Sequence, residues 1–218
     1  DRVVNKYRQE GKKIFFMTNN STKSRKQIWE KLTGMGLKCS YDEVYTSGYA
    51  AALYAKQMGY HTVYIMGSKA LEEEFGELDI TVSDQAEVVI VGYDMTFDYQ
   101  KLTDALQVAF HADKIIACNK ERHYPGENAK RMPGCGAMVG ALEGSLGREV
   151  DYSVGKPNPL LMEIICKDND LRPEEVVVVG DTYESDIVMA QNYGSSAVYI
   201  GEEDHKDIKC IHAIGELL

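Results

Sequence analysis

Short apolar runs alternate with segments of helical periodicity along the chain, and this alternation constrains the fold more than any other feature. Expected strands are Lys13–Met17, Thr62–Met66, Val88–Gly92, Lys114–Cys118, Val176–Val179 and Ala197–Ile200. Expected helices are Arg25–Met35, Gly48–Met58, Ser68–Phe75, Tyr99–Ala112, the segment that begins at Cys135, Leu160–Lys167 and Ser185–Tyr193. Strands that alternate with helices of this length favour βαβ units and parallel sheets. The sequence therefore predicts an α/β fold, with aliphatic runs such as Val176–Val179 covered on both faces.

Composition narrows the class of protein. The 218 residues carry 24 Lys and Arg against 34 Asp and Glu, a net charge of −10, whereas a nucleic-acid binder needs a basic surface. No apolar run approaches the length of a membrane span, and no segment resembles a targeting peptide. Five scattered cysteines without a C-x-x-C pair favour reduced thiols over a disulfide or zinc framework. We therefore expect a cytoplasmic protein that binds neither nucleic acid nor membranes.

Polar clusters follow two of the expected strands, where ligands gather in open parallel sheets. Thr18-Asn19-Asn20-Ser21-Thr22 follows the first strand, and Gly180-Asp181-Thr182-Tyr183-Glu184-Ser185-Asp186 follows the valine run. Between them, Lys156 stands in a Gly-Lys-Pro-Asn-Pro turn. Each cluster alone has a plain structural explanation, namely a helix cap, an Asx turn or a surface turn. Together they supply the donors, the ammonium and the carboxylates that a phosphate ester with Mg²⁺ requires.

A glycine string from Gly134 to Gly140 imitates a dinucleotide-binding fingerprint. A genuine fingerprint follows directly on a buried strand and spaces its third glycine differently. Here the string follows Lys130-Arg131-Met132-Pro133, which has no strand pattern. We therefore set nicotinamide and flavin binding aside.

The ordered motifs resemble those of the haloacid dehalogenase-like (HAD) superfamily, and in particular its NagD and p-nitrophenyl phosphatase type. The matching strings are F-x-T-N-N-S-x-x-S-R at 16–25, V-G-Y-D at 91–94, P-G-C-G at 133–136, V-G-K-P-N-P at 154–159 and G-D-x-x-x-S-D at 180–186. The resemblance implies a Rossmann-like parallel-sheet core with a large α/β cap inserted into it. Residues 1–47 and 151–218 would form the core, and residues 48–150 the cap.

The resemblance also implies site residues for a Mg²⁺-dependent phosphatase that acts on small phosphate monoesters. Thr18, Asn19 and Asn20 would hold the transferring phosphoryl group. Lys156 would stabilise its charge, and Asp186 would orient Lys156. Asp181 would bind the Mg²⁺ ion.

The cap is expected to select the substrate. Asn119 and His123 lie in a segment that mixes cationic, aromatic and polar residues, and the matching loop of the family leans over the leaving group. Sugar phosphates, nucleoside monophosphates, pyridoxal phosphate and phosphoglycolate all remain open as substrates. The oligomeric state also remains open, although caps of this kind often pair to form a homodimer.

One motif of the family is absent. Relatives begin with a strand that ends in Asp-x-Asp, whose first Asp is the nucleophile that becomes an aspartyl-phosphate. The 17 residues ahead of Thr18 contain no Asp-x-Asp. Loss of a central strand would leave buried backbone groups unpaired, at about 1–3 kcal/mol each, so we expect the nucleophile upstream of Asp1. The alternative is a relative without the nucleophile that binds a phosphorylated ligand, or regulates, without turnover.

Overall fold

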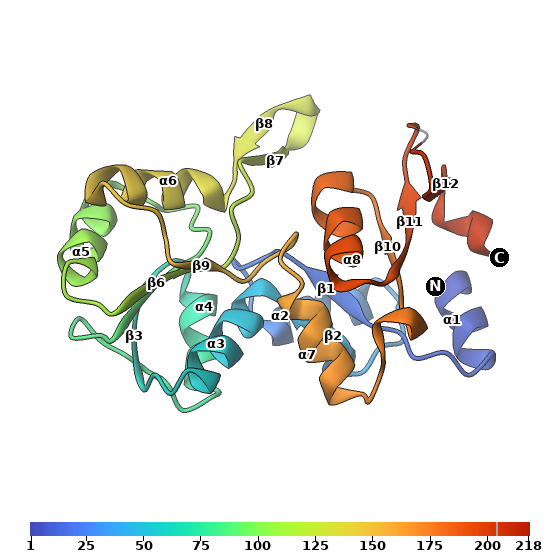
Figure 1. The fold of residues 1–218 in the computed structure, drawn as a ribbon, viewed down its shortest axis with the longest axis horizontal. Helices are drawn as coiled ribbons and strands as arrows, with labels where there is room; N and C mark the ends of the chain where they lie inside the picture. Colours follow the sequence, from blue (N-terminus) through green and yellow to red (C-terminus); the bar gives the residue numbers. More distant parts are fainter. Residues whose placement is uncertain (204) are drawn as a thin grey trace. The chain divides into compact units, whose positions relative to one another are not determined.

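The computed structural model describes residues 1–203 and 205–218, and it has the α/β fold that the sequence predicts. Figure 1 traces the chain from its first helix to its last strand. The chain folds as two compact units. Unit 1 contains Asp1–Met17, Trp29–Tyr45 and Lys156–Leu218, and unit 2 contains Thr18–Ile28 and Thr46–Gly155.

Unit 2 is built around a five-stranded sheet in which every pairing is parallel. Its strand order is β4 (Thr81–Val82), β3 (Thr62–Met66), β5 (Val88–Val91), β6 (Lys114–Ala117) and β9 (Tyr152–Ser153). The helices of this unit are α3 (Ser47–Gln57), α4 (Lys69–Gly76), α5 (Tyr99–Ala109) and α6 (Cys135–Leu146). In Figure 1, α5 and α6 lie on one side of the sheet and α3 and α4 on the other.

The central strand β5 shows how this unit buries its core. All four of its residues are fully buried. Val89 and Val91 pack in a cluster with Ala105 of α5 and Leu142 of α6. Since alternate side chains of a strand point to opposite faces, Val88 and Ile90 face the other layer of helices. A continuous aliphatic run fits a strand covered on both faces.

Unit 1 holds two smaller sheets. β1 (Phe16–Thr18) pairs with β2 (Val44–Thr46), and β10 (Val177–Gly180), β11 (Ser196–Ile200) and β12 (Lys209–Ile211) form a parallel three-stranded sheet. The helices are α1 (Arg2–Gln9), α2 (Arg25–Gly34), α7 (Leu160–Asp168) and α8 (Val188–Tyr193). The elements β1, α2 and β2 each begin in one unit and end in the other. Met162 of α7 and Met189 of α8 pack on Val178, and Met17 joins this cluster.

The predicted burial of the Val176–Val179 run is wrong. A strand does form there, but only Val178 is buried, whereas Val177 and Val179 are 56% and 39% exposed. Helices α7 and α8 cover the face that carries Val178, and the opposite face of β10 has no comparable cover among the described residues. The other predicted strands are confirmed, although the first lies at Phe16–Thr18, displaced toward the polar loop.

The sequence did not predict the short strands β2, β4, β9 and β12, nor two further local features. A hairpin of β7 (His123–Pro125) and β8 (Arg131–Pro133) projects from unit 2, with His123 opposite Pro133. The predicted helix at Ser185–Tyr193 begins as a π-helical turn at Tyr183–Ile187 before α8. Among the described helices, none combines the length and apolar character that a membrane crossing needs.

Candidate active site

The predicted site residues of unit 1 gather at the end of β10. The ammonium of Lys156 donates to Oδ1 of Asp186 at 2.5 Å, and each side chain is only 11% exposed. The second carboxylate oxygen of Asp186 accepts the backbone N–H of Thr182 at 3.1 Å. Two opposite charges in a shielded place hold each other far more firmly than a surface pair does. Lys156 is therefore a cation held in a fixed position.

Gly180 makes room for this pair. A Cβ atom at position 180 would lie 2.3 Å from Cβ and 2.4 Å from Cγ of Asp186, well inside contact distance. The π-helical turn that follows brings the buried Asp186 back over the end of the strand, with its N–H on the carbonyl of Thr182 at 2.7 Å. A glycine at the strand end is thus a steric requirement of the Lys156–Asp186 pair.

Asp181 lies on the same loop but is exposed. Its carboxylate makes no hydrogen bond or ion pair within the part of the chain that the structure describes, so it is not an Asx cap. A hard carboxylate oxygen of this kind suits a divalent cation. The described residues nevertheless bring no cluster of three acidic, histidine or cysteine ligands together. Asp181 therefore fits as one ligand of a metal site that needs further oxygen donors.

The Thr-Asn-Asn loop belongs to unit 2. Oγ1 of Thr18 accepts the N–H of Asn20 at 3.1 Å, and Oδ1 of Asn20 accepts the N–H groups of Thr22 and Lys23 at 3.0 Å. These bonds form a tight turn. They do not cap helix α2, because Ser24 and Gln27 fill that role through a reciprocal pair of bonds. The side-chain amide nitrogen of Asn20 has no hydrogen-bond partner among the described residues and is free to donate to a ligand.

Asn19 and Asn119 lie together inside unit 2. They are 6% and 3% exposed. The amide of Asn119 donates to the backbone carbonyl of Asn19 at 2.8 Å, and its Oδ1 accepts the N–H of Glu121 at 3.1 Å. Both polar groups of Asn119 are thus bonded within the protein. This arrangement favours a role for Asn119 in holding the loop over direct contact with a substrate.

His123, the other predicted substrate contact in this segment, is exposed at the first position of β7. Its neighbour Tyr124 is anchored, since its hydroxyl lies 3.0 Å from that of Tyr93. Burial, and then the hydrogen bond to Tyr124, raises the pKa of Tyr93 to about 12, so the Tyr93 phenol stays protonated at neutral pH. The contact between Tyr124 and Tyr93 thus fixes the hairpin that carries His123 to the rest of unit 2.

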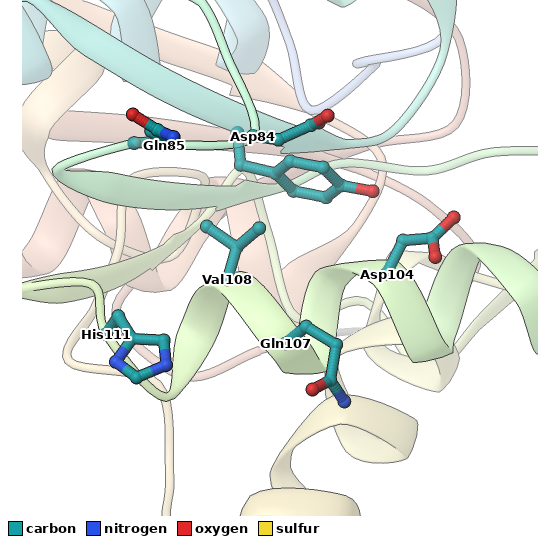
Figure 2. A pocket seen from close by; sticks show the side chains of 8 residues that line it. Asp84, Gln85, Asp104, Gln107, Val108 and His111 are labelled. Atoms are coloured by element: carbon teal, nitrogen blue, oxygen red, sulfur yellow. The ribbon is translucent and has the colours of Figure 1, made fainter.

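A hollow of about 690 Å³ lies elsewhere in unit 2 and contains none of the predicted site residues. Figure 2 shows Asp84 and Gln85 on one side of it, and on the other side Asp104 and Gln107 of α5 and His111, which follows that helix. Burial, followed by the charges of Asp104 and Asp84, raises the pKa of the Tyr64 phenol in its lining. Its carboxylates would repel a phosphate, so this hollow does not fit the predicted substrate.

Sequence reasoning gave no role to two acidic residues. Glu121 accepts the side-chain amide of Asn19 at 2.8 Å. Glu74, 1% exposed, accepts the backbone N–H of Arg25 at the start of α2. Both contacts join residues that are far apart in the sequence, and no local sequence pattern predicts them. The only sequence signal for Glu121 is the glycine string of residues 134–136, which packs against it.

Comparison with known proteins identifies the family of this chain. A family model described as haloacid dehalogenase-like hydrolase matches residues 1–81, and a second HAD-hydrolase-like model matches residues 153–213. The sugar-phosphatase AraL of Bacillus subtilis is 31% identical over 202 residues, which cover 91% of this chain and 74% of AraL. The chain therefore belongs to the haloacid dehalogenase-like hydrolase family.

Solved structures define the type within this family. The p-nitrophenyl phosphatase from Archaeoglobus fulgidus aligns with a TM-score of 0.87 at 30% identity, over 99% of this chain and 82% of its own. A NagD protein aligns with a TM-score of 0.90 at 25% identity, over 96% of this chain and 85% of its own. The protein is thus a HAD-like hydrolase of the NagD and p-nitrophenyl phosphatase type.

Proposed function

We propose that this protein is a phosphatase that hydrolyses small phosphate monoesters. The observation that carries the proposal is the shielded Lys156–Asp186 pair, which holds an ammonium where a phosphoryl group would need charge neutralisation. Family membership supports it, since the similar proteins include a sugar phosphatase and a p-nitrophenyl phosphatase. Sugar phosphates are accordingly the first substrates to test.

In the proposed reaction, Thr18, Asn19 and Asn20 hold the phosphoryl oxygens and Lys156 stabilises their charge. A carboxylate oxygen attacks phosphorus, the bond from phosphorus to the ester oxygen breaks, and the leaving alcohol takes a proton from the second Asp of the expected Asp-x-Asp motif. Water then hydrolyses the aspartyl-phosphate and releases inorganic phosphate. His123 would contact the leaving group from the hairpin. The division into a core of residues 1–47 and 151–218 and a cap of 48–150 is part of the same proposal.

The attacking carboxylate is proposed to come from a further strand of unit 1. Among the described residues β10 pairs only with β11, and β1 pairs only with β2, although Met17 and Val178 share one core cluster. Unpaired strand edges beside a shared core favour another strand between them. The proposal assigns the nucleophile to that strand, upstream of Asp1.

Family membership implies a divalent metal, and we propose Mg²⁺ with Asp181 as one of its ligands. When bound, the ion would neutralise charge on the phosphoryl oxygens. Asp186 would orient Lys156 and the water ligands of the ion. The chain's net charge of −10 makes such neutralisation useful, because an unaccompanied anion would be repelled.

A second candidate is a non-catalytic relative that binds a phosphorylated ligand without turnover. The shielded Lys156–Asp186 pair also fits this candidate, because an ammonium held in place binds a phosphate group with or without turnover. Such a protein would keep the Lys156–Asp186 pair and the Thr-Asn-Asn loop as a binding cradle.

One experiment separates the two candidates. Phosphate release is measured with Mg²⁺ on a panel of sugar phosphates, nucleoside monophosphates, pyridoxal phosphate, phosphoglycolate and p-nitrophenyl phosphate, using the whole reading frame that encodes residues 1–218. Turnover of at least one ester supports the phosphatase. Saturable binding of an ester without phosphate release supports the second candidate, and neither binding nor release would contradict both.

A further inference from the structure

Asn19 is held from three directions. Its backbone carbonyl accepts the Ser47 hydroxyl at 2.7 Å and the Asn119 amide at 2.8 Å, and its own amide donates to Oε1 of Glu121 at 2.8 Å. The residue is 6% exposed. These three bonds restrict the backbone between Thr18 and Asn20.

Glu121 is itself held by the start of helix α6. Its N–H donates to Oδ1 of Asn119 at 3.1 Å, and its carbonyl accepts the N–H of Gly136 at 2.8 Å. The N–H of Gly134 donates to the carbonyl of Arg122 at 2.9 Å. Main-chain bonds at the carbonyls of Glu121 and Arg122 therefore fix this segment to the start of the helix.

This close approach requires glycine. A Cβ atom at Gly134 would lie 2.3 Å from the carbonyl oxygen of Glu121, and one at Gly136 would lie 2.8 Å from the same oxygen and 2.7 Å from that of Lys120. On the other side of the loop, a Cβ atom at Gly155 would lie 2.8 Å from Oδ1 of Asn19. Backbone atoms cannot yield as flexible side chains do, so the glycines set how near Glu121 comes to Asn19.

We propose that Glu121 is a positioning residue for the phosphate-holding loop, and that Gly134 and Gly136 serve to place it. The carboxylate fixes the side-chain orientation of Asn19 and, through it, the backbone on which Thr18 and Asn20 are presented. Because His123 lies two residues after Glu121 and begins β7, the same contact ties the substrate-reading hairpin to this loop. The effect of this contact on catalysis rests on the proposed phosphatase function. The contact between Glu121 and Asn19 is independent of that function.

The test compares three variants. Glu121→Ala removes the acceptor, Glu121→Gln keeps an oxygen that can accept the Asn19 amide, and Glu127→Ala removes an exposed carboxylate from the tip of the same hairpin. The first readout is the side-chain amide signal of Asn19 in ¹⁵N NMR, identified by its loss in Asn19→Asp. We expect this signal to shift in Glu121→Ala and to stay near its wild-type position in Glu121→Gln and Glu127→Ala.

The second readout is turnover of p-nitrophenyl phosphate. Misplacement of a substrate-holding group by a fraction of an ångström costs about tenfold or more in rate, so kcat should fall about tenfold in Glu121→Ala and less than about threefold in the other two. Equal losses in Glu121→Gln and Glu121→Ala would overturn the positioning role, because they would assign the effect to the charge. An unshifted Asn19 signal in Glu121→Ala would overturn the contact.

The two proposals fail in different ways. If the wild-type protein released no phosphate while the Asn19 signal followed the expected pattern, the phosphatase would be wrong and the contact would stand. If turnover were normal in Glu121→Ala with a shifted signal, the contact would exist without the proposed role. A gross fold change in Glu121→Ala is excluded by requiring that its amide signals away from Asn19 keep their wild-type positions.

Discussion

Two buried carboxylates, Asp186 in unit 1 and Glu74 in unit 2, have opposite surroundings. Asp186 faces the ammonium of Lys156 and the N–H of Thr182. Glu74 faces the backbone N–H of Arg25, and its second oxygen has no hydrogen-bond partner among the described residues. Burial raises the pKa of Glu74 to about 7, and the charges of Glu77 and Glu73 add to this, while the Arg25 bond and charge oppose it. Asp186 thus has a shielded cation beside its carboxylate, whereas Glu74 has no such partner and is about half protonated at pH 7.

Lys156→Met should produce the largest effect, because it converts Asp186 into an acid without its cation. Turnover of p-nitrophenyl phosphate should fall at least about 100-fold, as for loss of one electrostatic stabiliser of the transition state. The free energy of unfolding should fall by about 3 kcal/mol, since a buried charge loses its partner. Steady-state kinetics and urea titration measure the two effects. Lys167→Met, at an exposed lysine of α7, is the control and should change neither.

Glu74→Gln should remove a pH dependence of stability. Because the folded protein raises the pKa of Glu74 from 4.5 to about 7, it binds this proton more tightly than the unfolded chain does. The stabilising contribution is therefore complete below about pH 4.5 and is lost as the pH rises through 7. Between pH 5 and pH 8 the wild type should lose about 2–3 kcal/mol relative to Glu74→Gln, measured by urea titration. Parallel pH profiles would contradict the assignment.

Gly180→Ala tests the steric basis of the Asp186 arrangement. Its new Cβ atom would overlap the Asp186 side chain, which should cost about 2 kcal/mol in unfolding free energy and weaken turnover. Thermal unfolding and kinetics are the measurements. Gly144→Ala, within α6 where an added Cβ meets nothing within 4 Å, should instead be neutral or slightly stabilising. A stable and fully active Gly180→Ala protein would show that the packing at the end of β10 is not needed.

Asp181→Asn should have the smallest of these effects and leave the fold intact, because the side chain is exposed and unbonded among the described residues. Turnover with Mg²⁺ should fall at least about tenfold, about 1.4 kcal/mol of transition-state stabilisation. A Mg²⁺ titration of the rate measures it. Glu184→Gln removes another exposed carboxylate three residues away and should retain full activity. Equal behaviour of the two variants would remove Asp181 from the proposed metal site.

The sequence predicted most of the elements because their signals are local. The apolar run Val88–Val91 became a fully buried strand, and Ser68 caps α4 by accepting the N–H of Leu71. The same reasoning misjudged Val177 and Val179, because an aliphatic run reports the propensity to form a strand and not the layers that cover it. The π-helical turn before α8 was missed for a similar reason, since it depends on the fit of Asp186 against Gly180.

The candidate site was predictable where residues are adjacent in the sequence and not where they meet across it. Asn19 and Glu121 are 102 positions apart, and only their fold brings them into contact. The string Pro133-Gly134-Cys135-Gly136 was visible in the sequence, but its glycines could be explained only once the backbone of Glu121 was seen against them. Asn119 changes from an expected substrate contact to a proposed support of the loop for the same reason.

The central claim is that Lys156 is the cation that receives the phosphoryl group, and phosphate binding tests it most directly. Inorganic phosphate is titrated calorimetrically, with Mg²⁺ present, into the wild-type protein and into Lys156→Met. We expect saturable binding to the wild type and at least about a tenfold loss of affinity in the variant, since one ammonium contact to phosphate is removed. Equal phosphate affinity in the two proteins would contradict the claim.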